Sequence, residues 1–146
     1  MPIYVDVSRC VGCRSCEVAC QRVHSVTGHI RVGIQDDLAS VPLVCHHCQE
    51  PTCAMACYSG ALIHEGERTS FDLNKCTGCG LCTLACPFGI IHVQKVAQKC
   101  DLCSGREAPA CVTTCPAQAL SMMTYEEATT RLRSLAAAVV VRGGRA

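Results

Sequence analysis

Sixteen cysteines dominate the chemistry available to this chain of 146 residues. They form four groups of four, each opening with C-x2-C and closing with C-x3-C, and only the middle gap varies. The quartets are Cys10, Cys13, Cys16 and Cys20; Cys45, Cys48, Cys53 and Cys57; Cys76, Cys79, Cys82 and Cys86; and Cys100, Cys103, Cys111 and Cys115. A repeat of this kind sets the architecture of a chain.

Three chemistries use grouped cysteines. Disulfides belong to oxidising compartments and rarely keep one quartet spacing four times. Zinc binds four thiolates, but its sites usually join two separate C-x2-C pairs. The spacing C-x2-C-x2-C-x3-C-P is a bacterial [4Fe–4S] signature, and CTGCGLCTLACP, residues 76–87, matches it at every position. The sequence therefore predicts iron bound through the sixteen cysteines in four [4Fe–4S] clusters.

The spacing also indicates which cluster each cysteine binds. The first three thiolates of a quartet lie on one loop, where soft sulfur ligands suit iron–sulfur clusters. The fourth lies about one helical turn, roughly 6 Å, further along, and in two-cluster ferredoxins it ligates the other cluster. Pro87 directly follows Cys86, and Pro116 directly follows Cys115. These prolines should end the helices there, because the residue before proline avoids helical geometry.

The glycines between the ligands predict a particular backbone geometry. Gly12, Gly78 and Gly80 lie between cysteines of the first and third quartets. Glycine permits positive φ and close approach of backbone N–H groups to a cluster.

Each fourth cysteine needs a partner quartet, and two pairings are open. Sequential pairing joins the first quartet to the second and the third to the fourth, whereas nested pairing joins second to third and first to fourth. The linker over residues 58–75 is typical of a hairpin, with ALIHE, a turn at Gly66 and RTSFD. Apolar segments, ALI and GIIHV, follow both inner quartets. These features favour nesting.

The histidines are expected to play ordinary roles. His46 and His47 lie inside the second quartet, where four thiolates already complete a site, so we expect loop geometry and a hydrogen bond to sulfur. The others are expected to be ordinary polar or surface residues: His24, His29, His64 and His92.

Two lysines occupy equivalent places in the repeat. Lys75 and Lys99 each precede the first cysteine of a quartet. One interpretation is a cation that favours the reduced, more negative cluster and raises its potential. The other is a solvated surface lysine.

The cysteine segments resemble those of a known family, the four-cluster, sixteen-cysteine ferredoxin-like electron-transfer subunits. Such subunits serve dimethyl sulfoxide reductase, formate hydrogenlyase, carbon monoxide dehydrogenase and tungsten-containing aldehyde oxidoreductase. The matching segments are CVGCRSCEVAC, PLVCHHCQEPTCAMAC, KCTGCGLCTLACPFGI and KCDLC...CVTTCPAQAL. The resemblance runs from about Val5 to Met122.

The resemblance implies nested pairing and a ligand set for each cluster. The sets are Cys10, Cys13, Cys16 and Cys115 for cluster A; Cys100, Cys103, Cys111 and Cys20 for cluster B; Cys45, Cys48, Cys53 and Cys86 for cluster C; and Cys76, Cys79, Cys82 and Cys57 for cluster D. The seven-residue gap in the fourth quartet is shorter than in many relatives, which suggests a trimmed loop and places cluster B nearer the surface.

We therefore expect an α+β fold of two fused, pseudo-symmetric, bacterial-ferredoxin-like modules with nested cluster pairing, plus a C-terminal helix. The outer module comprises residues 1–44 and 94–123, with the first and fourth quartets. The inner module comprises residues 45–93, with the second and third quartets. Residues 124–146 form the C-terminal helix and tail.

That helix is predicted to run from about Tyr125 to Arg142 and to end at Gly143-Gly144. Thr124 with Glu127 fits a capping box at its start. An apolar stripe at helical spacing consists of Leu132, Leu135, Ala136 and Val139. The helix either packs on its own core or docks another subunit or another copy of the chain.

Composition argues against several function classes. The net charge is +1 and aromatic residues make up 3 %, so we expect no nucleic-acid partner. No G-x-G-x-x-G after a strand, P-loop, nucleophile elbow or paired catalytic carboxylates is visible, so we expect a non-catalytic subunit. The first ten residues do not read as a signal peptide, and the longest apolar run, residues 135–141, is too short for a membrane span. We expect a cytoplasmic protein.

The resulting hypothesis is an electron-transfer subunit of a multi-subunit oxidoreductase. The resemblance implies protein redox partners on both sides. One is a tungsten- or molybdenum-containing aldehyde or formate oxidoreductase subunit, or carbon monoxide dehydrogenase. The other is a NAD-reducing flavoprotein or a hydrogenase subunit, and copies of the chain could also dock end to end. The competing hypotheses are an iron–sulfur redox sensor and a zinc-binding structural module.

Overall fold

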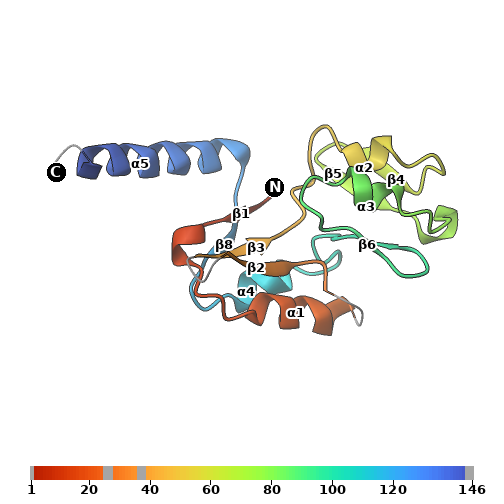
Figure 1. Ribbon diagram of the computed structural model, residues 1–146, viewed down its shortest axis with the longest axis horizontal. Coiled ribbons are helices and arrows are strands. Elements are labelled where there is room, and N and C mark those ends of the chain that lie inside the picture. The colour runs from red at the N-terminus through yellow and green to blue at the C-terminus, as the bar shows by residue number, and fades with distance from the viewer. Residues whose placement is uncertain (1, 25–27, 36–38, 144–146) are drawn as a thin grey trace.

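Four separate two-stranded sheets form the framework of the computed structural model, which describes residues 2–24, 28–35 and 39–143 (Figure 1). All four pairs are antiparallel, and no strand is longer than five residues. The pairs are β1 (Ile3–Val5) with β8 (Leu120–Met122), β2 (Arg31–Gln35) with β3 (Ala39–Leu43), β4 (Leu62–Glu65) with β5 (Arg68–Phe71), and β6 (His92–Val93) with β7 (Ala97–Gln98). Isolated hairpins of this size are marginal in water, so other contacts must hold them.

The middle of the chain forms one cluster of elements, confirming the predicted hairpin between the second and third quartets. Strands β4 and β5 pair across a turn in which Gly66 has φ of +64°. The short helices α2 (Thr52–Met55) and α3 (Leu81–Ala85) contact each other beside this hairpin. The predicted strand GIIHV is shorter than expected, because only its last two residues pair. Ile90 and Ile91 precede the pairing and are buried.

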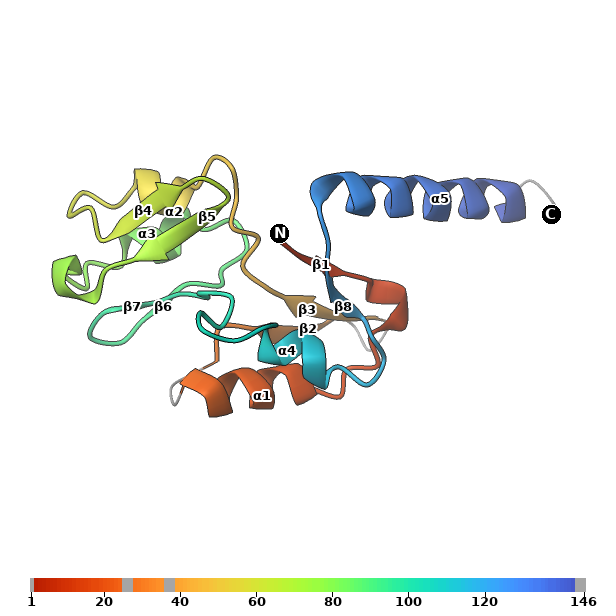
Figure 2. The ribbon, with the colours of Figure 1, turned by 180° about the vertical axis from the view of Figure 1, so that it is seen from behind.

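The two ends of the described chain form the other cluster. Strand β1 pairs with β8, which brings segments about 115 residues apart into one sheet, from Ile3 opposite Met122 to Val5 opposite Leu120. Helices α1 (Ser15–His24) and α4 (Ala110–Thr114) lie against each other, as Figure 2 shows. Two 3-10 turns, η1 (Val7–Arg9) and η2 (Leu73–Lys75), lead into the first and third quartets.

Helix α5 (Tyr125–Gly143) extends away from both clusters of elements (Figures 1 and 2). The capping box is confirmed, because Glu127 N–H donates to Thr124 Oγ1 at 3.2 Å while Thr124 N–H donates to the Glu127 carboxylate at 2.8 Å. No described residue of α5 is buried, and Leu132, Leu135 and Val139 are 53, 42 and 71 % exposed. Packing of the apolar stripe on its own core is therefore not observed. Gly144 lies outside the described residues.

None of the described helices combines the length and the apolar character needed to cross a membrane.

Candidate iron–sulfur sites

Three cavities are each lined by four cysteines, and each set combines three residues of one quartet with the last residue of another. The sets are Cys76, Cys79, Cys82 and Cys57; Cys10, Cys13, Cys16 and Cys115; and Cys45, Cys48, Cys53 and Cys86. None of the sixteen cysteines forms a disulfide. Four thiols around one small cavity are the donor set that an iron–sulfur cluster requires.

The cysteines of the fourth quartet are deeply placed, so the expected position near the surface is wrong. Cys103 and Cys111 are 5 and 6 % exposed. Burial, together with the neighbouring Cys20 and Cys103 thiols, raises the pKa of Cys111 to about 12. The physical reason is helix packing: α1 lies against α4, and Ala19 and Ala110 enclose Cys103. The gap residues 104–107 are themselves exposed, whereas Cys111 lies on α4 where that helix packs against α1.

The third cysteine of each quartet lies on a helix. Cys86 is the C-cap of α3 and Cys115 the C-cap of α4, and both have extended backbone, with ψ of 113° and 107°. Pro87 and Pro116 follow them and disfavour helical geometry at these caps, as the sequence predicted.

The opening C-x2-C loop of every quartet has a left-handed residue immediately before its second cysteine. The four φ values are +67° at Gly12, +45° at His47, +71° at Gly78 and +59° at Leu102. The expectation for the glycines is confirmed, and Gly80 also has φ of +81°. The left-handed conformation of His47 and Leu102 was not predictable from sequence, because it is uncommon for a histidine or a leucine. The loop geometry thus recurs without a recurring residue type.

Backbone N–H groups point at several thiols. His29 N–H donates to Cys20 Sγ at 3.2 Å, and Ala119 N–H donates to Cys115 Sγ at 3.3 Å. Ala97 N–H donates to Cys76 Sγ at 3.4 Å. Hydrogen bonds of this kind favour the anionic sulfur that ligates a metal and tune the potential of a bound cluster.

The two lysines of the repeat have opposite environments. Lys75 is a surface residue beside Asp72, with Nζ 3.8 Å from the carboxylate. Lys99 is 6 % exposed and donates hydrogen bonds to the carbonyl oxygens of Thr69 at 3.0 Å and Cys100 at 3.1 Å. The surface interpretation is thus confirmed for Lys75, whereas Lys99 is buried and the effect on a cluster potential stays a prediction. Sequence could not separate them, because burial depends on what folds over each position.

His47 lines the cavity of Cys45, Cys48, Cys53 and Cys86 and is 3 % exposed. Its Nδ1 accepts from Thr69 N–H at 3.4 Å, and burial followed by the charge of Lys99 lowers its pKa to about 4, so the ring is neutral. Its Nε2, which then carries the proton, is buried and has no partner in the described part of the chain. An unpaired donor on a residue that lines a cavity of thiols fits a sulfur-rich cluster.

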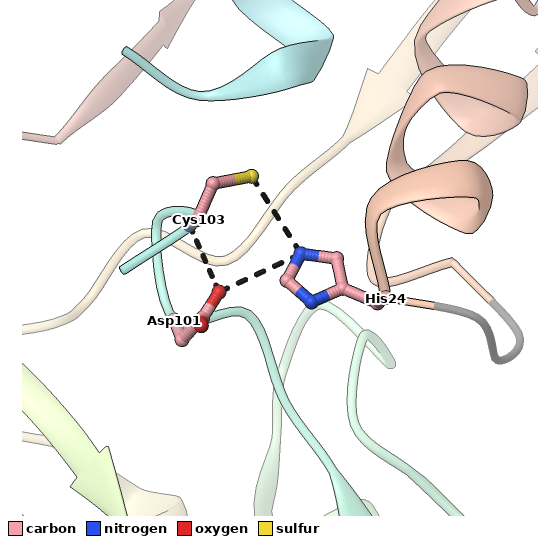
Figure 3. A group of neighbouring side chains, drawn as sticks. All are labelled: His24, Asp101 and Cys103. Carbon is pink, nitrogen blue, oxygen red and sulfur yellow. Dashed lines mark hydrogen bonds and ion pairs between the residues drawn. The ribbon is translucent and has the colours of Figure 1, made fainter. Parts of the chain in front are cut away.

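His24 and His29 are not the ordinary surface residues expected, and both have partners near the fourth quartet. Their rings lie 4.7 Å apart. His29 is 7 % exposed, and burial, then the neighbouring His24, lowers its pKa to about 4. His24 Nε2 lies 3.6 Å from both Asp101 Oδ1 and Cys103 Sγ (Figure 3). These contacts join α1 to the fourth quartet across about 80 residues, which no local pattern could reveal.

The remaining histidines differ in position. His46 also lines the cavity of Cys45, Cys48, Cys53 and Cys86, and its ring is tilted against Phe88 with the centroids 4.3 Å apart. His64 and His92 are partly exposed strand residues, which agrees with the ordinary role expected of them.

Comparison with known families covers all four quartets. A family model described as a 4Fe-4S dicluster domain matches residues 37–125, which contain the second, third and fourth quartets. A 4Fe-4S binding domain matches residues 7–26, which contain the first. The dicluster match ends at the first residue of α5.

Similar proteins of Escherichia coli K12 carry related segments in chains of different length. The putative oxidoreductase AegA is 37% identical over 142 residues, which cover 84% of this chain but only 22% of AegA. The putative electron transport protein YsaA is 38% identical over 143 residues, covering 86% of this chain and 90% of YsaA. Hydrogenase-4 component A is 31% identical over 183 residues, covering 92% of this chain and 89% of hydrogenase-4 component A. The chain thus spans about a fifth of AegA but nearly the whole of the other two.

The matches exclude a zinc module as the explanation of the quartets. All sixteen cysteines fall inside regions that match 4Fe-4S domains, and cavities lined by four thiols fit the cofactor. The chain binds four [4Fe–4S] clusters and belongs to the family of ferredoxin-like 4Fe-4S dicluster proteins.

Proposed function

We propose that this protein is a non-catalytic electron-transfer subunit that relays electrons between two partner proteins. When bound, each cluster supplies a centre that accepts and releases an electron. The observation that carries the proposal is the composition of the three cavities, each of which takes its fourth cysteine from a different quartet. Neighbouring sites are thereby tied together by the helices that carry the third cysteine of each quartet.

The same observation supports nested ligand sets, which we propose as expected from the sequence. Cluster A takes Cys10, Cys13, Cys16 and Cys115, and cluster C takes Cys45, Cys48, Cys53 and Cys86. Cluster D takes Cys76, Cys79, Cys82 and Cys57. The remaining cysteines, which fall to cluster B, are Cys20, Cys100, Cys103 and Cys111. Three of these are mutual neighbours, because the Cys20 and Cys103 thiols both help raise the pKa of Cys111, after burial.

The arrangement supports a linear order of the four sites. Clusters A and B share helices, since Cys16 and Cys20 both lie on α1. Clusters C and D are tied by α2 and α3, which contact each other. The Cys45 thiol lies close enough to Cys100 to help raise its pKa, after burial, so clusters B and C adjoin. We therefore propose the order A, B, C, D.

This order divides the chain as the repeat suggests. The proposed outer module, residues 1–44 and 94–123, holds clusters A and B. The proposed inner module, residues 45–93, holds clusters C and D. Pseudo-symmetry between the modules is part of the same proposal, supported by the four equivalent left-handed positions in the C-x2-C loops.

The partners follow from the relatives and from the resemblance. In AegA, a segment similar to this chain is part of a longer polypeptide that is named a putative oxidoreductase. We propose that this chain instead works with an oxidoreductase that is a separate polypeptide. One partner is a tungsten- or molybdenum-cofactor subunit or a carbon monoxide dehydrogenase. The other is a flavoprotein or a hydrogenase subunit, as the name hydrogenase-4 component A suggests. A cytoplasmic location is proposed because it keeps thiol ligands reduced.

Anaerobic purification of the native complex tests the function. Four clusters require about sixteen irons per chain with matching acid-labile sulfide. We expect the co-purified catalytic subunit to reduce all four clusters when its substrate is added, as followed by EPR. Clusters that stay oxidised in an intact, active complex would refute the relay.

Three serine variants separate the two pairings. Nested pairing assigns Cys86 to the same cluster as Cys48, whereas sequential pairing assigns it to the cluster of Cys103. We expect Cys86→Ser to alter the same EPR signal as Cys48→Ser and a different one from Cys103→Ser. A Cys86→Ser spectrum that coincides with that of Cys103→Ser would overturn nesting.

A further inference from the structure

Lys99 lies where the inner and outer modules meet. It follows β7 and precedes the first cysteine of the fourth quartet. Its ammonium donates to the carbonyl oxygen of Thr69 on β5 at 3.0 Å and to that of Cys100 at 3.1 Å. His47, inside the second quartet, lies 3.4 Å from the same nitrogen through Nδ1. The side chain therefore joins the loops of the second and fourth quartets.

The charge of Lys99 is not balanced by these partners. Two are carbonyl oxygens and the third is an imidazole nitrogen, and none of them carries a negative charge. The residue is 6 % exposed, so water screens the ammonium poorly. A buried ammonium is strongly unfavourable unless negative charge lies nearby.

Two groups of cysteines supply that negative charge when they ligate a cluster as thiolates. Lys99 lines the cavity of Cys45, Cys48, Cys53 and Cys86. On the other side, its ammonium donates to the carbonyl oxygen of the adjacent Cys100 at 3.1 Å. The ammonium thus lies beside proposed ligands of both cluster C and cluster B.

We propose that Lys99 is a fixed positive charge that raises the reduction potentials of clusters B and C, the two centres at the junction of the modules. Reduction adds negative charge to a cluster, and a buried cation beside it favours the reduced state. The functional role of this charge rests on the proposed relay, in which an electron passing between the modules must cross this junction.

The test is a redox titration of the complete chain, monitored by EPR under anaerobic conditions. Lys99→Met removes the charge and keeps the shape, and Lys99→Gln also keeps a hydrogen-bond donor. Lys99→Arg keeps the charge. The matched control is Lys75→Met, because Lys75 occupies the same place before the third quartet but is exposed beside Asp72.

We expect both neutral variants to shift the midpoint potentials of two of the four clusters to more negative values. Lys99→Arg should keep those potentials close to wild type, and Lys75→Met should produce a smaller shift at any cluster. Unchanged potentials in a neutral variant that binds all sixteen irons would overturn the proposal, as would an equal shift of all four clusters.

The proposal would also be overturned if both neutral variants lost clusters while Lys99→Arg retained them. Lys99 would then be required for the stability of the fold and not for the cluster potentials. The titration needs no redox partner, so its outcome is separable from that of the proposed function. A chain that shows the shift but exchanges no electrons with a purified partner would refute the relay alone.

Discussion

At the scale of single residues, the C-x2-C loops depend on one left-handed position each. Glycine serves there in the first and third quartets, whereas His47 and Leu102 adopt the same conformation against their intrinsic preference. At Gly78 there is a second constraint, because a Cβ would collide with the backbone carbonyl oxygen of Lys95 in the turn between β6 and β7. A Cβ added at Gly80, by contrast, would have no neighbouring atom within 4 Å.

We expect Gly78→Ala to be clearly more destabilising than Gly80→Ala. Both variants place alanine at positive φ, at a cost of about 1 kcal/mol. Gly78→Ala also forces a backbone carbonyl to move, which adds about 2 kcal/mol. The measurement is the temperature at which the visible absorbance of the clusters is lost, and equal losses in the two variants would contradict the collision.

At the scale of elements, α5 is held to the rest of the protein by one buried carboxylate. Asp6 is 7 % exposed and accepts hydrogen bonds from Ser8 Oγ at 2.6 Å and Arg131 Nη2 at 3.0 Å. The bond from Ser8, and after it the bond from Arg131, lowers the pKa of Asp6 against the opposing effect of burial. Arg131 also lies 5.5 Å above the ring of Tyr4. Residues near the N-terminus thus fix the start of the C-terminal helix.

Asp6→Asn should loosen α5 without affecting the clusters. Because Arg131 is 36% exposed, the ion pair is worth only about 1 kcal/mol, which corresponds to roughly fivefold faster tryptic cleavage within α5. Asp72→Asn, which removes the surface pair with Lys75, is the matched control and should leave cleavage unchanged. Equal cleavage in Asp6→Asn and wild type would show that α5 is held by other contacts.

Removing α5 altogether should separate assembly from cluster binding. Truncation at Thr124 removes the exposed apolar stripe but none of the sixteen cysteines. We expect an unchanged visible spectrum and weaker association with the native redox partners, measured by co-purification. A truncated chain that retains its partners at full stoichiometry would argue against docking through α5.

At the scale of the whole molecule, the conventional core is small. Among the described residues, eighteen hydrophobic side chains are buried, and five of these are cysteines: Cys16, Cys20, Cys82, Cys103 and Cys111. Five more are alanines, so few large aliphatic side chains remain. Two-stranded sheets add little stability of their own. The clusters therefore supply much of the interior around which the elements are arranged.

Removal of iron should unfold the protein. We expect treatment with a chelator and reductant to abolish the cooperative thermal transition in circular dichroism, because the cysteine-lined cavities lose their contents. Adding iron and sulfide back under anaerobic conditions should restore the cooperative thermal transition. An iron-free chain that still melts cooperatively near the original temperature would show that the apolar core is sufficient.

Local features of this protein were predictable from sequence, and contacts between distant segments were not. The turn at Gly66, the capping box of Thr124 and Glu127, and the helix ends before Pro87 and Pro116 depend on residues a few positions apart, so the sequence predicted them correctly. The burial of Lys99 depends on contacts with Thr69 and His47, 30 and 52 residues away. The depth of the fourth quartet likewise depends on α1, from the opposite end of the chain.

The pairing of β1 with β8 has a consequence for the order in which a new chain is completed. A ribosome releases Ile3 long before it makes Met122, so the first sheet cannot form until synthesis is almost finished. The hairpin of β4 and β5 is available some fifty residues earlier. Nascent chains stalled so that Gln98 has just left the ribosome should therefore protect the middle segment from proteases while Cys10 to Cys20 stay open to thiol reagents. The cysteines that are translated first are enclosed last.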